Sequence, residues 1–190
     1  MNQNLIILDA GFYKAENKTN KRKLNELLCR SEQVHRNIFH KHNFPEDPEK
    51  LYQNLNKHRK KIKKLRNDGK MYKNEFELVL PQSKKSFSQK FDSPLIVKLL
   101  SNFVPGINVP SNGWDKMPEP DDETEESHMV RLVINRHKIQ HFTGYVPEPE
   151  FKEIAVTMIQ SLVALGEDEK SFEDILPPCL LYTSPSPRNS

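Results

Sequence analysis

Cysteine is nearly absent from this chain, which argues against a fold held together by disulfides. The only two, Cys29 and Cys179, lie far apart in the sequence. Secreted domains stapled by disulfides carry several closely spaced pairs, so we expect a reducing compartment instead. Glycine is scarce as well, and the six glycines are isolated from one another. This excludes the clustered glycines of a loop that cradles the phosphates of a nucleotide.

Long apolar runs are also missing. No segment approaches the roughly 18 consecutive apolar residues that a membrane span needs, and the opening NLIIL is too short for a secretory signal. Apolar residues make up 35% of the chain and charged residues 29%. We therefore expect an intracellular protein, nuclear or cytoplasmic, with a small core and no contact with a membrane.

Charge is what the chain has in excess, and it is unevenly placed. Residues 14–73 hold 18 Lys and Arg against 7 Asp and Glu, a net charge of +11. Residues 113–176 hold 6 against 15, a net charge of −9. Either the two segments neutralise each other, which requires them to lie within about 8 Å at physiological salt, or the basic segment meets an external polyanion.

A helix is predicted from Pro48 to Asn67. Asp47 and Pro48 form a start signal, an N-cap acceptor followed by proline at the first helical position, and the glycine at 69 ends the helix. Its apolar residues recur every three or four positions, as in a coiled coil, although two heptads are too few for an independent one. We expect this seam to pack on a helix of this chain or of a partner. Its members are Leu51, Leu55, Ile62 and Leu65.

The same helix carries the densest charge of the chain, the stretch KHRKKIKKLR at residues 57–66. Three uses are open: a solvated helix face, recognition by a nuclear import receptor that reads short Lys-rich stretches, or binding of a polyanion. Aromatic residues for base stacking are few nearby, so RNA would be bound by its phosphate backbone. The residues expected to hold an acidic partner or a polyanion are Lys57, Arg59, Lys60, Lys61, Lys63, Lys64 and Arg66.

The predicted fold class is α+β and rich in helix. Residues 14–73 are expected to form a basic helical hairpin or arm, built from a helix over 20–42 and the helix over 48–67. Residues 74–176 are expected to form a small domain with a β-hairpin. Its strands are predicted at 75–80, 129–135 and 138–145, and its helices at 94–103, 149–165 and 168–176. Residues 1–13 form an apolar segment, either a short strand or a plug that docks on the body.

A long irregular segment is predicted at 105–128, where four prolines and two glycines occur and six acidic residues follow Lys116. Loops of this length are usually functional or disordered. Trp114, the only tryptophan, lies in its middle. Either Trp114 folds back onto the core or it is a docking residue for another protein.

The end of the chain needs separate treatment. The stretch CLLYTSPSPR resembles a translated sequencing-adapter read-through rather than a segment of a protein family. We therefore expect residues 177–190 to be a non-native tail, and we leave 179–190 out of the fold prediction. The alternative is a genuine Ser- and Pro-rich disordered tail.

Metal and catalytic sites have little support in the sequence. The candidate metal ligands, which cluster in the first predicted helix, are Cys29, His35, His40 and His42. A structural zinc site needs two close ligand pairs, and these side chains do not share one helical face. His137 and His141 lie in the predicted hairpin without a nucleophile on a recognisable turn. We expect no metal, no cofactor and no small-molecule substrate.

These features together favour a non-enzymatic protein. We expect an interaction or scaffold subunit of a larger assembly, which docks protein partners through the basic helix and the acidic, Pro-rich loop. The alternative is an RNA-associated nuclear or ribosome-type protein that binds the phosphate backbone through residues 57–66.

Overall fold

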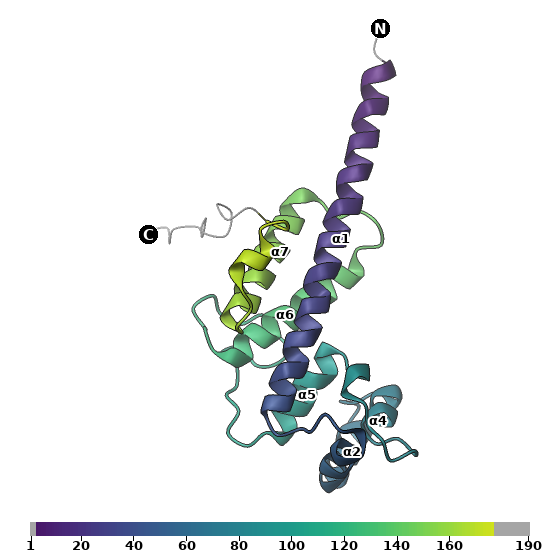
Figure 1. The fold of residues 1–190 in the computed structure, drawn as a ribbon, viewed down its shortest axis with the longest axis vertical. Helices are drawn as coiled ribbons and strands as arrows, with labels where there is room; N and C mark the ends of the chain where they lie inside the picture. Colours follow the sequence, from purple (N-terminus) through teal and green to yellow (C-terminus); the bar gives the residue numbers. More distant parts are fainter. Residues whose placement is uncertain (1–2, 177–190) are drawn as a thin grey trace. The chain divides into compact units, whose positions relative to one another are not determined.

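The computed structural model describes residues 3–176, with side chains from Thr19 onward, and every regular element in that part of the chain is a helix (Figure 1). The α+β class and the β-hairpin expected from the sequence are therefore wrong. The predicted tail at 177–190 lies outside the described residues. No described helix has the length and apolar character that crossing a membrane requires.

Helix α1, Gln3–Lys41, is a single uninterrupted helix of 39 residues (Figure 1). It confirms the helix expected at 20–42 and begins much earlier, so the segment 1–13 is helical from Gln3 onward. The described chain forms two compact units. Residues 3–31 and 110–176 form unit 1, and residues 32–109 form unit 2.

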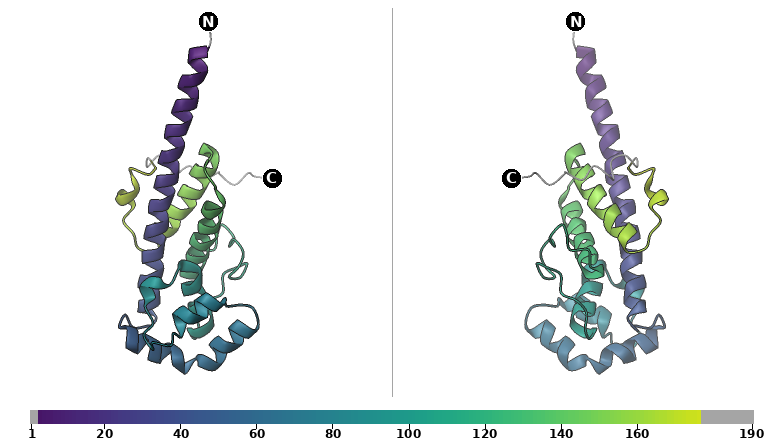
Figure 2. Two further views of the ribbon diagram at one scale, coloured as in Figure 1. Left: turned by 90° about the vertical axis from the view of Figure 1, so that its right-hand side faces the viewer. Right: turned by 90° about the vertical axis from the view of Figure 1, so that its left-hand side faces the viewer.

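Unit 1 contains the first part of α1 together with α6 (Glu125–His141), α7 (Glu148–Ala164) and the 3-10 turn η2 (Glu169–Phe172). Helices α6 and α7 lie side by side (Figures 1 and 2). Helix α7 confirms the prediction at 149–165. Gly166 ends it with a φ of 105°, a conformation that costs glycine little.

Helix α6 occupies the segment in which two strands were predicted, at 129–135 and 138–145, and those predictions are wrong. Thr124 caps the helix by accepting a hydrogen bond from the backbone N–H of Ser127 at 3.3 Å. Every residue from Glu126 to Val133 is buried. Because this end of α6 has no solvent-exposed face, polar residues do not mark its helical period in the sequence, and the β-branched residues then suggest a strand.

Unit 2 contains the end of α1 and several shorter elements: α2 (Pro48–Lys57), α3 (Arg59–Asn67), α4 (Lys73–Val79), the 3-10 turn η1 (Ser88–Lys90) and α5 (Ser93–Phe103). Its core includes a group of aromatic rings. Phe39 stacks on Phe44 with 4.1 Å between ring centroids and meets Phe91 edge-on at 6.0 Å. Such pairs stabilise a core beyond the area that they bury.

The helix predicted over 48–67 is present but is divided at His58. This residue has φ −94° and ψ 10°, and its backbone N–H bonds to the carbonyl of Leu55 at 3.0 Å. Figure 2 shows α2 and α3 meeting at a bend. The predicted start is confirmed, because the Asp47 carboxylate accepts a hydrogen bond from the backbone N–H of Lys50 at 2.8 Å. Gly69, with a φ of 71°, follows α3.

Helix α4 lies where a strand was predicted at 75–80, so that prediction is wrong. The Glu75 carboxylate accepts a hydrogen bond from the backbone N–H of Tyr72 at 2.6 Å and so fixes the start of the helix. Six residues are too few to distinguish the period of a helix from that of a strand. Phe76, Val79 and Leu80 have helical spacing, whereas the alternation of apolar and polar residues over the same segment is typical of a strand. Helix α5 confirms the prediction at 94–103.

Candidate nucleic-acid interface on helix α3

Helix α3 presents its charge to solvent. Ile62 and Leu65 are buried, with exposed fractions of 0% and 7%. The predicted cations are all exposed, and we call them the basic face. Lys57 ends α2, and the others lie on α3: Arg59, Lys60, Lys61, Lys63, Lys64 and Arg66. The stems of such side chains lie along the helix while the charged ends stay in water.

The basic face has no acidic counterpart. In the part of the chain whose side chains are described, none of its residues forms an ion pair with Asp or Glu. Some other cations of unit 2 do have an acidic partner: Lys85 Nζ lies 2.9 Å from a Glu49 oxygen, and Lys98 Nζ lies 2.7 Å from a Glu75 oxygen. The charge of the basic face is therefore left to solvent or to a ligand.

Some residues of the basic face are held by neutral groups. Lys61 donates a hydrogen bond to the carbonyl oxygen of Asn102 and lies 5.2 Å from the centroid of the Phe103 ring. Arg59 donates to Asn56 Oδ1 at 3.1 Å. The side chains of four lysines have no hydrogen bond or ion pair with any described residue, and we call these residues the unpaired lysines: Lys57, Lys60, Lys63 and Lys64.

The spacing of these cations is unfavourable for the helix itself. Lys60 and Lys64 stand four residues apart on α3, and so do Arg59 and Lys63. Like charges at this spacing destabilise a helix by about 0.2–0.5 kcal/mol per pair. A bound polyanion would relieve this repulsion.

The predicted seam residues point the other way, into unit 2. Leu51, Leu55 and Ile62 each have 0% of their surface exposed, and Leu65 has 7%. Helix α3 contacts α4, and the ring of His58 lies 4.9 Å from the ring of Phe103. The seam is therefore covered by this chain's own residues.

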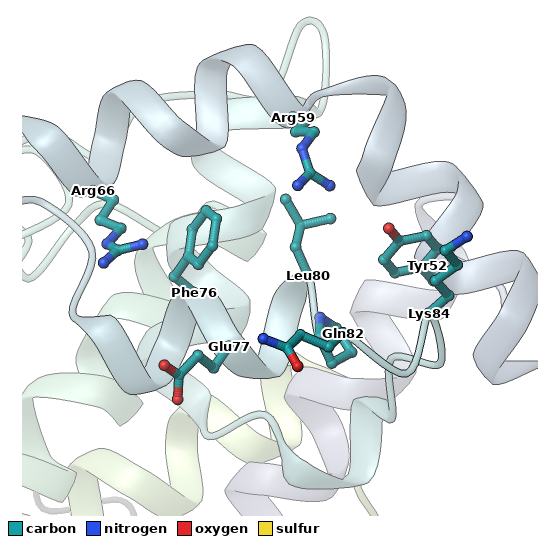
Figure 3. A pocket seen from close by; sticks show the side chains of 9 residues that line it. Tyr52, Arg59, Arg66, Phe76, Glu77, Leu80, Gln82 and Lys84 are labelled. Carbon is teal, nitrogen blue, oxygen red and sulfur yellow. The ribbon is translucent and has the colours of Figure 1, made fainter.

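A hollow lies between α3 and α4, within unit 2, and has a volume of about 850 Å³ (Figure 3). Helix α2 contributes Tyr52 and helix α4 contributes Phe76 and Glu77. Two residues of the basic face, Arg59 and Arg66, also line it. Sequence reasoning missed the hollow because residues 75–80 were predicted as a strand. The i, i+4 spacing of Phe76 and Leu80 was the available signal.

The arginines reach toward apolar groups of α4. Figure 3 shows the guanidinium of Arg59 above Leu80 and that of Arg66 beside the Phe76 ring. The Arg66 guanidinium carbon lies 4.8 Å from the centroid of this ring. A planar guanidinium stacks on an aromatic face, which a lysine ammonium cannot do.

In unit 1, the loop with Trp114 is held by its own polar groups. Trp114 is half-buried. Asp122 accepts a hydrogen bond from the backbone N–H of Ser111 at 2.7 Å and one from Thr124 Oγ1 at 2.8 Å. Hydrogen bonds from Ser127, Ser111 and Thr124 hold the pKa of Asp122 well below its usual range. This carboxylate of the acidic loop is thus already engaged within unit 1.

The histidines considered at the sequence level are spread over different environments. His35 is buried, whereas His137 and His141 are exposed near the end of α6. Arg136, beside them, donates a hydrogen bond to Gln140 Oε1 at 3.2 Å. Within the described part of the chain, no three His, Cys, Asp or Glu side chains come close enough together to hold a metal ion. Cys29 is exposed, with a free thiol.

The fold and the site thus define an all-helical protein with one strongly cationic helix. A family model supplies the identification: the chain belongs to the DZIP3/hRUL138-like HEPN family, whose model matches residues 48–181. The match includes α2 to η2 and therefore the basic face and the hollow. Searches of curated proteins and of solved structures found no match.

Proposed function

We propose that this protein binds single-stranded RNA through phosphate contacts made by the basic face of α3. The observation that carries the proposal is the absence of any carboxylate partner for these seven cations in the described part of the chain. The unpaired lysines are the strongest candidates for direct contact with phosphate. Their ammonium groups are exposed and not held by other described groups, so they can follow an irregular backbone.

The expected mechanism is release of counterions. Each lysine that neutralises a phosphate displaces condensed cations from the strand, so log K falls with log salt by about 0.7 per phosphate on single strands. Four phosphates, one for each unpaired lysine, give a slope of about −3. Such binding selects no particular base sequence, because contacts with phosphates position a strand without distinguishing its bases.

The structure changes the balance between the two functions expected from the sequence. A scaffold that docks a partner helix on the seam needs these leucines at the surface, whereas they are buried. An acidic protein remains the competing ligand for the basic face. RNA is favoured because the cations occupy the whole exposed arc of α3 rather than one stripe, which suits a flexible strand better than a second folded surface. We propose a binding role without chemistry, in the nucleus or cytoplasm.

The experiment is a salt titration with a fluorescent ten-nucleotide RNA and the full chain. We expect micromolar or tighter binding at physiological salt and a slope of about −3. The variant Lys60→Ala/Lys63→Ala/Lys64→Ala removes three of the unpaired lysines. It should bind at least tenfold more weakly at low salt, and its slope should be shallower by about 2.

The matched control removes three exposed lysines of unit 1, in the variant Lys116→Ala/Lys152→Ala/Lys170→Ala. Its net charge changes by the same amount, so unchanged affinity would show that position matters rather than total charge. Equal loss in both variants, or no binding by the wild type at physiological salt, would contradict the proposal. A denaturing gel of the recovered RNA separates binding from cleavage, for which His137 and His141 would be the residues to replace.

A further inference from the structure

We propose that the hollow between α3 and α4 binds one unstacked purine base of the RNA strand, with guanine preferred; this inference rests on the RNA binding proposed above. The first observation is how the basic face divides by residue type. Its two arginines, Arg59 and Arg66, line the hollow, while the unpaired lysines do not. The arginines are seven residues apart, about two helical turns, and so lie on one side of α3.

The second observation is that the wall offers flat apolar surfaces. Phe76 and Tyr52 contribute aromatic rings and Leu80 contributes an aliphatic side chain. Phe76 is only half-buried, and the Arg66 guanidinium lies 4.8 Å from its centroid. Bases stack on aromatic rings and on guanidinium planes alike. A strand that passes along the unpaired lysines therefore finds a stacking surface beside them.

The third observation is the set of polar groups around these rings. The arginines supply hydrogen-bond donors. Glu77, the one acidic residue of the wall, supplies acceptors, and its carboxylate also lies 3.9 Å from Lys73 Nζ. Guanine presents O6 and N7 acceptors to an arginine fork, and its N1–H and amino group can donate to a carboxylate. Adenine pairs an N7 acceptor with an amino donor on that edge, so it cannot satisfy the same fork.

The size and rim of the hollow agree with such an occupant. Its volume of about 850 Å³ lies within the ~300–1,000 Å³ of sites for small organic ligands. The turn from Pro81 to Lys84 forms part of the rim, closed by a hydrogen bond from the Lys84 N–H to the Pro81 carbonyl at 3.2 Å. Lys84 has a φ of 56°, a left-handed conformation that is uncommon for residues other than glycine. Its amine adds a third cation to the wall, which suits the backbone phosphate of the same nucleotide.

The test uses three ten-nucleotide RNAs that differ at one central position in a run of uridines. The position carries guanine, adenine or no base, so the number of phosphates is constant and the salt-dependent contribution is the same. We expect the wild type to bind the guanine strand about tenfold more tightly than the abasic strand, with adenine between them. Phe76→Leu should remove most of this advantage while keeping the salt slope. Glu77→Gln should bring guanine close to adenine.

The triple lysine variant is the matched control, because it should weaken binding of all three strands alike and keep their order. Circular dichroism and thermal melts identify any variant that fails to fold. If Phe76→Leu fails to fold, Glu77→Gln, at an exposed position, still tests the base site. Equal affinities of the wild type for guanine and abasic strands, with salt dependence intact, overturn the base site and leave the proposed function standing. Failure to bind any of the strands overturns both.

Discussion

The guanidinium of Arg66, on α3, lies over the ring of Phe76, on α4, with 4.8 Å between the guanidinium carbon and the ring centroid. This contact joins two helices separated in sequence by the turn at Gly69. It also fixes one wall of the hollow before any ligand arrives. A preset arginine loses less rotational freedom on binding than a free one, so it contributes more to affinity.

The contribution of this pair to stability can be measured by a double-mutant cycle with Arg66→Gln and Phe76→Leu. Because Arg66 is exposed, we expect a coupling free energy of about 0.5–1 kcal/mol. Urea denaturation of the four proteins, followed by circular dichroism, gives the value. A coupling indistinguishable from zero would show that the stacked geometry does not persist in solution.

The buried seam makes a stronger prediction. Leu55→Ala removes a side chain with 0% exposure, and such truncations cost about 2–5 kcal/mol. We expect the free energy of unfolding to fall by this amount, measured by denaturant titration, and RNA affinity to stay unchanged under conditions where the variant is folded. Lys57→Ala, two residues away on the exposed side, is the control and should change stability by less than about 0.5 kcal/mol. If Leu55→Ala were equally mild, the seam would have to lie at the surface, free for a partner.

Sequence reasoning predicted the helices well where charge and apolar residues alternate with a clear period. The start of α2 at Asp47 and Pro48, the burial of Ile62 and Leu65 and the end of α7 at Gly166 all follow from local chemistry. These signals act over a few residues and need no knowledge of the rest of the fold.

The strand predictions failed because burial on several sides is not a local property. From Glu126 to Val133 every residue of α6 is buried, including polar ones such as His128 and Arg131. No sequence window shows which neighbours will cover them. The hollow was missed for a related reason, since its wall combines α2, α3, α4 and the following turn, which come together only in the folded unit.

Relief of charge repulsion on α3 gives a further prediction. Lys60→Glu places a glutamate in the first turn of α3, four residues before Lys64 and three before Lys63, and so replaces repulsion by attraction at the end of the helix where the dipole also favours an acid. We expect the free energy of unfolding to rise by about 0.4–1 kcal/mol at low salt, since both the repulsive and the attractive terms are about 0.2–0.5 kcal/mol. The gain should shrink as salt is added.

The same variant should bind RNA more weakly than Lys60→Ala, because it adds a negative charge to the proposed phosphate surface. A protein that becomes more stable while its ligand affinity falls would show that α3 keeps its cations for binding. Urea titrations at two salt concentrations, run beside the RNA titration, test both parts. A loss of stability in Lys60→Glu would contradict the argument.

The contacts of His128, on α6, predict that the free energy of unfolding depends on pH. This buried histidine faces a basic and an acidic group: Arg131 donates to its Nδ1 at 3.2 Å, and its Nε2 lies 3.0 Å from a Glu123 oxygen. The neutral ring with the proton on Nε2 satisfies both contacts, whereas a proton on Nδ1 would oppose the arginine. Burial and the charge of Arg131 lower the pKa of His128, while Glu123 and Asp122 raise it in part.

A lowered pKa in the folded state means that the unfolded chain takes up the proton first as the pH falls. The free energy of unfolding is then highest above about pH 6.5, the value for a free histidine, and falls as the pH drops from there through the folded pKa. We expect His128→Gln to lose less stability than the wild type between pH 7.5 and pH 5, because glutamine can accept from Arg131 and does not titrate. Urea titrations across this range provide the measurement. His137→Gln, at an exposed position, should follow the wild type, and identical pH profiles for all three proteins would show that His128 does not couple the loop to pH.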